Sequence, residues 1–127
     1  MSVSSPPAAQ QFGRSVLHQR PVDLAKVRSA MARAARLAKV VDEPAARDPI
    51  QRVVVRLMGM VHEMLPGAEA ACGRAPDGRT KDILRATIDH SRSILLQSEA
   101  GVVRSTSAQL TLLSGACRLL LRYQVEQ

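Results

Sequence analysis

The 127-residue sequence predicts an all-α protein, an antiparallel four-helix bundle with a disordered N-terminal tail and a proline-kinked second helix. Aromatic residues make up only 2% of the chain, whereas Ala and Leu are abundant, and this balance favours helices over a sheet. Apolar residues recur at steps of three and four along four segments, the spacing that places them on one face of a helix. Short clusters of helix-breaking residues separate the segments, so consecutive helices should run antiparallel.

The first 20 residues differ in composition from the rest of the chain. They are rich in Ser, Pro, Ala and Gln and show no apolar period. This composition is typical of a disordered segment. We therefore expect residues 1–20 to be dispensable for folding and residues 21–127 to form the bundle.

The first two predicted helices are separated by a cluster that ends at Pro44. The first helix should begin at Pro21, with Asp23 in its first turn, because proline suits the first helical position. The second should open after Pro49. Their apolar stripes are Leu24, Val27, Met31, Ala34, Ala38 and Val41 in the first helix, and Ile50, Val54, Leu57, Val61, Met64, Ala68 and Ala71 in the second.

Pro66 lies within the second stripe. A proline inside a helix removes one backbone hydrogen bond and clashes with the preceding turn. Because the stripe continues to Ala71, the sequence predicts a kink between His62 and Pro66, or a break into two helices there.

The last two predicted helices run from about Thr80 to Glu99 and from about Ser105 to Val125. Leucines at the middle of a stripe should be the most deeply buried, so we predict a core that includes Leu57, Leu84, Leu113 and Leu120. The stripes are Leu84, Ile88, Ser91, Leu95 and Ser98 in the third helix, and Thr106, Leu110, Leu113, Cys117, Leu120 and Gln124 in the fourth.

The net charge is +7, and the positive residues are spread along the chain rather than gathered in a basic tail. The first helix is the exception, since the side opposite its stripe carries basic residues with no acidic residue among them. This candidate basic face is either a solvated polar surface or a nucleic-acid-binding surface, and the sequence leaves both open. Its residues are Lys26, Arg28, Arg33, Arg36 and Lys39.

The fourth helix has more apolar surface than one stripe requires. Leu112, Ala116, Leu119 and Tyr123 extend its apolar side along one edge of the helix. A bundle helix needs only a modest apolar face, so this edge is a candidate interface. Either another helix of the chain or a second subunit should cover it.

No pattern for catalysis, a metal or a cofactor is visible. His62 and Glu63 begin like a zinc-protease motif, but Pro66 stands where the second histidine is required. Cys72 and Cys117 make neither a zinc signature nor a disulfide framework, and we expect both to be small buried hydrophobes. We therefore expect no enzyme activity, no metal and no cofactor.

We expect the protein to be cytoplasmic. No apolar run approaches the roughly 20 residues that a membrane span needs, so no membrane association is expected. No secretory signal is visible, and two lone cysteines suit a reducing compartment.

Three short motifs carry a resemblance to known proteins. They are Leu65-Pro66-Gly67-Ala68-Glu69, Glu99-Ala100-Gly101 and the Leu- and Arg-rich run from Leu113 to Tyr123. Through them, residues 50–127 resemble a family of small actinobacterial all-helical proteins of unknown function, often labelled natural-product-biosynthesis-associated. The resemblance implies a helical fold and a genomic context, and it brings no catalytic residues.

The expected function is that of a small cytoplasmic accessory or regulatory protein that acts by protein–protein interaction. The partner is either another protein or a second copy of the chain, and the resemblance implies a link to natural-product biosynthesis. The alternative is a nucleic-acid-binding regulator that uses the candidate basic face of the first helix.

Overall fold

The computed structural model describes residues 22–101 and 106–124, and these residues form helices and turns without any strand. The predicted all-α helical bundle is therefore confirmed. The predicted tail, residues 1–20, lies outside the described residues. The helices are α2 (Leu24–Ala38), the short 3-10 helix η1 (Pro44–Ala46), α3 (Arg47–Arg74), α4 (Arg79–Glu99) and α5 (Thr106–Leu121).

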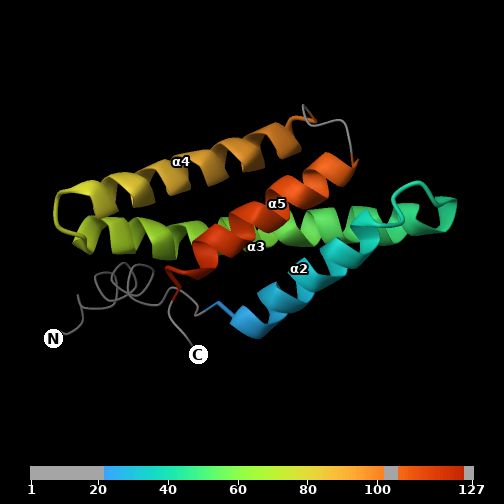
Figure 1. Cartoon of the computed structure of the whole chain (residues 1–127), viewed down its shortest axis with the longest axis horizontal. Helices are drawn as coiled ribbons and strands as arrows, with labels where there is room; N and C mark the ends of the chain where they lie inside the picture. Colours follow the sequence, from blue (N-terminus) through green and yellow to red (C-terminus); the bar gives the residue numbers. More distant parts are fainter. Residues whose placement is uncertain (1–21, 102–105, 125–127) are drawn as a thin grey trace, which may run out of the picture.

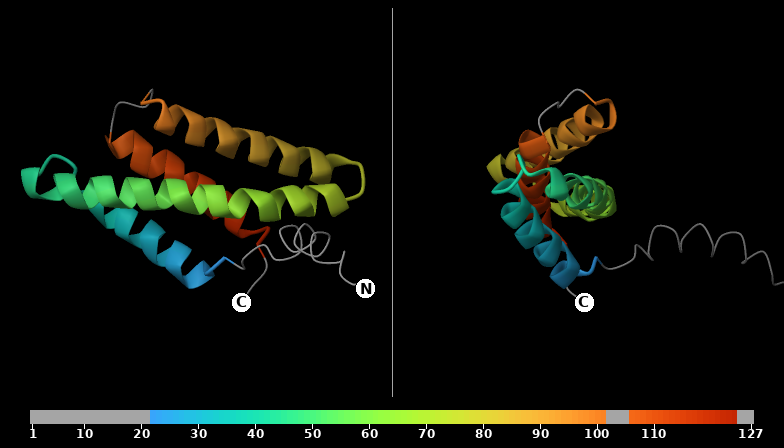
Figure 2. Two further views of the ribbon diagram at one scale, coloured as in Figure 1. Left: turned by 180° about the vertical axis from the view of Figure 1, so that it is seen from behind. Right: turned by 90° about the vertical axis from the view of Figure 1, so that its right-hand side faces the viewer.

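Consecutive α-helices run antiparallel, as predicted (Figure 1). Helices α3 and α4 form a long hairpin, and α2 and α5 lie side by side obliquely across it. Helices α3 and α5 each pack against the other three, whereas α2 and α4 lie on opposite sides of α5 (Figure 2). Helix α5 crosses α3 obliquely and makes its most extensive contact with it (Figure 1).

Helix α2 is shorter than predicted at both ends. It begins at Leu24, because Asp23 is the N-cap and its Oδ1 accepts a hydrogen bond from the Lys26 backbone N at 3.2 Å. The expectation that Asp23 lies inside the first turn is therefore wrong. The helix ends at Ala38, where the backbone N–H groups of Lys39 and Val40 bond to carbonyls three residues back and the chain turns.

Helix α3 runs through Pro66 without interruption over 28 residues. The alternative of a break into two helices at this proline is therefore wrong, and a bend of the axis there stays a prediction. Proline costs the helix one backbone bond, but Leu65 and Ala68 on either side of it are buried in the core. Their packing against the neighbouring helices offsets the lost bond.

The four leucines predicted for the core are all buried: Leu57, Leu113 and Leu120 are fully inaccessible and Leu84 is 3% exposed. Helix α4 is bounded by Gly78 and Gly101, whose φ angles of 142° and 73° lie in a region that other residues rarely adopt. These glycines let the chain reverse on both sides of α4. Helix α5 ends at Leu121, four residues before the predicted end.

Candidate interaction surface

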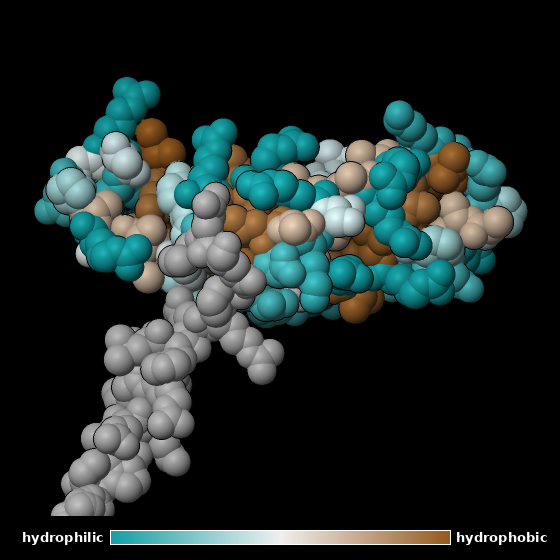
Figure 3. Space-filling model, turned by 90° about the horizontal axis from the view of Figure 1, so that it is seen from below, coloured by the Kyte–Doolittle hydropathy of each residue, from teal (hydrophilic) through white to brown (hydrophobic). Residues whose placement is uncertain are grey.

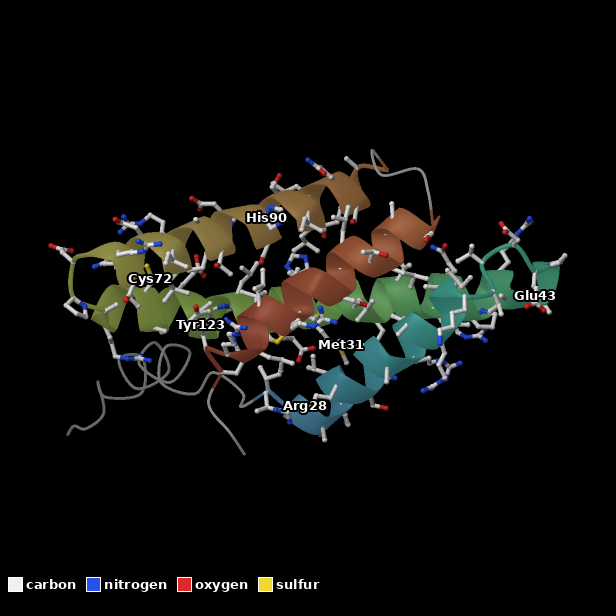
Figure 4. The ribbon with its side chains drawn as sticks, in the orientation of Figure 1. Arg28, Met31, Glu43, Cys72, His90 and Tyr123 are labelled. Carbon is white, nitrogen blue, oxygen red and sulfur yellow. The ribbon has the colours of Figure 1, made fainter. Side chains whose placement is uncertain are left out.

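A groove of about 190 Å³ lies between α2 and α5. It exists because small side chains from both helices face each other where larger ones would close the gap. Met31 lies between the two helices at one end of the groove (Figure 4). The residues that line it are Met31, Ala34, Ala35 and Ala38 from α2, and Leu110, Thr111, Ser114, Gly115 and Arg118 from α5.

The candidate basic face predicted on the first helix is solvent-exposed throughout. None of its five basic side chains makes an ion pair with another described residue. Arg118 on α5 and Arg122, which directly follows α5, are also exposed and lack an ion-pair partner among the residues that the structure describes. We call the combined set the basic surface: Lys26, Arg28, Arg33, Arg36, Lys39, Arg118 and Arg122.

No acidic residue occurs within Leu24–Ala38 or Thr106–Leu121, so neither helix of the pair supplies a carboxylate to this surface. Seen from below, the side on which α2 lies, hydrophilic side chains are interleaved with hydrophobic ones (Figure 3). Helical spacing alone predicts only the α2 half of the basic surface. The α5 half was missed because the apolar and polar spacing within one helix does not show which other helix packs beside it.

Charges on the other helix pair are mixed and partly neutralised. Arg92 of α4 hydrogen-bonds to Glu69 of α3 and lies 3.8 Å from Asp89, between its Nη1 and the carboxylate Oδ1. His62 Nε2 of α3 hydrogen-bonds to Glu99 Oε2 at 2.9 Å. The Arg92–Glu69 and His62–Glu99 contacts join α3 to α4 along their exposed side, and they give this pair a different electrostatic character from α2 and α5.

One basic residue, Arg118, lines the groove, and helical spacing places three more along its two flanks. Ala35 lines the α2 side of the groove. Arg28 is seven residues before Ala35 and Lys39 is four residues after it, so both lie on the same flank of α2 as Ala35. Arg118 lines the α5 side, and Arg122 follows one turn later. The groove therefore has a mostly apolar floor between two basic rims.

The candidate interface on the fourth helix is partly covered by the protein's own core. Ala116 is only 1% exposed, so the protein's own core covers this residue, which is one of the two arrangements that the sequence left open. Leu112 and Tyr123 are half-buried and pack partly against the core, with Tyr123 at the C-terminal end of α5 (Figure 4). Leu119 is half-buried as well. The edge available to a partner is thus limited to Leu112, Leu119 and Tyr123.

A second cavity, of about 460 Å³, lies between the start of α2 and the middle of α3. Its charged side chains have both signs, so it has no preference for a ligand of one charge. They are Asp23, Lys26, Arg56 and Glu63.

The cysteines and histidines form no cluster. Cys72 and Cys117 are both buried, as predicted, and burial raises the pKa of the Cys117 thiol to about 12. That thiol is therefore protonated at neutral pH, and its Sγ lies 4.0 Å from the Leu57 carbonyl oxygen. His90 is exposed on α4 (Figure 4). Within residues 22–101 and 106–124, no three His, Cys, Asp or Glu side chains come together to hold a metal ion.

None of the helices described here combines the length and the apolar character that crossing a membrane requires. Comparison with known proteins finds no matching family model, no matching curated protein and no matching solved structure. The resemblance drawn from the sequence motifs therefore stays a prediction.

Proposed function

We propose that this chain is a small helical accessory or regulatory protein that acts by binding another protein through the surface of α2 and α5. The observation that carries the proposal is the α2–α5 groove, with its mostly apolar floor and its basic rims. Protein–protein interfaces have the same plan, an apolar centre surrounded by a polar rim. The basic rim residues have no intramolecular ion-pair partner among the described residues, so they are available to acidic groups of another molecule.

Binding to nucleic acid is the second candidate, and the seven residues of the basic surface favour it. Phosphate groups attract Lys and Arg irrespective of sequence. An apolar groove adds nothing to contacts with a phosphate backbone, however, and the chain has only one Phe and one Tyr for stacking on bases. The groove thus favours a protein partner over a nucleic acid.

The proposal is one of binding rather than catalysis. The buried Cys117 is protonated at neutral pH and cannot serve as a nucleophile. We place the protein in the cytoplasm because two unpaired cysteines suit a reducing compartment. The link to natural-product biosynthesis rests on the resemblance of residues 50–127 alone.

Affinity capture from the native host, with and without nuclease, tests the proposal. We expect a protein that stays bound after nuclease treatment and is lost when the bait carries Arg28→Glu and Arg118→Glu. A matched bait with Arg79→Glu and Arg85→Glu changes two exposed arginines of α4 and should keep the partner. Retention that disappears with nuclease, and falls steeply with salt, would instead support the nucleic-acid function.

A further inference from the structure

The floor of the α2–α5 groove is open down to the backbone at one point. A Cβ built on Gly115 meets no atom within 4 Å, so the space above this glycine is empty. Ala34, Ala35 and Ala38 line the opposite wall with single methyl groups. A partner's side chains can therefore enter the groove and contact both helices, as apolar anchors do when a helix binds in a groove.

The two rims set the charge that the occupant must carry. Arg28 on α2 and Lys39, the residue that directly follows this helix, are 11 residues apart, which at about 1.5 Å per residue is roughly 16 Å, or three helical turns. Arg118 and Arg122 form the facing rim on α5, one turn apart. An occupant that lies along the groove thus meets basic side chains on both flanks and apolar surface beneath it.

We infer that the α2–α5 groove binds an acidic amphipathic helix of the partner protein, an inference that rests on the proposed function. Such a helix inserts apolar residues spaced at i, i+3 or i+4, and i+7 into the groove. It places Asp or Glu on both sides of that stripe, opposite the two basic rims. Charge complementarity selects this occupant, because a basic or neutral helix would leave four exposed positive charges unpaired at the contact.

The first measurement uses a synthetic peptide of about 18 residues, long enough to form a helix on binding. Its Leu residues follow the helical spacing and its Glu residues lie on both flanks. A scrambled peptide of identical composition has the same charge without the amphipathic pattern. Fluorescence anisotropy should show that the full-length protein binds the patterned peptide at least about tenfold more tightly than the scrambled one.

A matched pair of glycine variants locates the site. Gly115→Leu fills the groove, and Gly73→Leu places the same side chain on α3, away from it; neither glycine has an atom within 4 Å of its ideal Cβ. We expect Gly115→Leu to weaken binding of the patterned peptide about tenfold or more, and Gly73→Leu to leave it unchanged. Circular dichroism should show both variants folded, and both should melt at or somewhat above the wild type, since replacing a helical glycine by leucine raises helix propensity by up to about 1 kcal/mol in either helix.

Three results overturn the inference. Equal binding of the patterned and scrambled peptides means that charge alone attracts the ligand. Unchanged binding in Gly115→Leu means that the groove is not the site. A double-stranded DNA that displaces the peptide from the wild type and binds Gly115→Leu equally well assigns the basic surface to nucleic acid.

The proposed function and this inference fail in different ways. If the captured protein is lost with Leu119→Arg but not with Gly115→Leu, the protein–protein function stands and its site is the α5 edge rather than the groove. If the patterned peptide binds as expected but nuclease-treated capture retains no protein, the groove chemistry stands and the proposed function fails.

Discussion

The side chain of Gln124 occupies the space that a side chain on Gly67 would need. A Cβ at residue 67 would lie 2.7 Å from Gln124 Oε1. Gln124 Nε2 donates hydrogen bonds to the carbonyl oxygens of Met64 and Leu120, each at 2.9 Å. This amide therefore ties the chain directly after α5 to α3 at Met64, two residues before Pro66, and it can do so only because residue 67 lacks a side chain.

The first prediction concerns this contact and uses a double-mutant cycle. Gln124→Ala should lower the free energy of unfolding by about 1 kcal/mol, because it removes the hydrogen bond between the helices. In the Gly67→Ala background the same change should cost far less, since the new methyl group already displaces the amide. Urea denaturation of the four proteins measures the coupling, and strictly additive effects would show that Gln124 does not depend on Gly67.

The second prediction concerns the core. Leu113 is fully buried, so Leu113→Ala should lower the free energy of unfolding by about 2–5 kcal/mol through lost burial and a residual cavity. Leu96 is 59% exposed on α4, and Leu96→Ala should cost less than about 0.5 kcal/mol. Chemical denaturation compares the two, and similar costs would mean that the apolar stripes are wrongly placed.

A buried hydroxyl gives the third prediction. Ser91 is fully inaccessible, and its Oγ has no hydrogen-bond partner among the residues that the structure describes. An unpaired buried polar group costs about 1–3 kcal/mol, so Ser91→Ala should stabilise the protein. Ser29→Ala on the exposed side of α2 measures the gain from helix propensity alone, about 0.5 kcal/mol. A melting temperature for Ser91→Ala at or below that of Ser29→Ala would contradict the expectation.

The fourth prediction follows from the raised pKa of Cys117. In the unfolded chain a cysteine ionises near pH 9, whereas burial keeps the folded thiol protonated up to about 12. The contribution of the protonated Cys117 thiol to the free energy of unfolding is therefore complete below pH 9. This contribution is lost as the pH rises to 12, by about 1.4 kcal/mol per pH unit.

The test is a comparison between variants, so that any other effect of alkaline pH on stability is common to all of them. The decline in stability from pH 9 to 12 should be shallower in Cys117→Ala than in the wild type. Cys72→Ala is the control for cysteine removal. If both variants show the wild-type decline, the thiol of Cys117 does not control alkaline stability.

The apolar stripes predicted the core well because burial follows helical spacing directly. Even Ser91 and Ser98, polar members of the third stripe, are buried where the spacing placed them. Helix ends were less predictable, because the end of α2 depends on local turn bonds at Lys39 and Val40 rather than on the stripe.

The candidate site was predicted only in part, because its geometry depends on which helices become neighbours. Helical spacing put Ala116 on the apolar edge of the fourth helix but left open whether the protein's own core or a partner covers it, and the core does. It also assigned the basic residues to the first helix alone. The contribution of Arg118 appears only when α5 lies beside α2 and the groove forms between them.

Helix α5 packs against all three other helices, and it is the last of them to be synthesised. While the ribosome is still adding residues, α2, α3 and α4 have no α5 to cover their inner faces. The nascent chain therefore cannot complete this core until α5 has been synthesised and can pack on these faces. A chain truncated before Thr106 would expose these apolar faces permanently, which makes incomplete translation products the species most prone to aggregate.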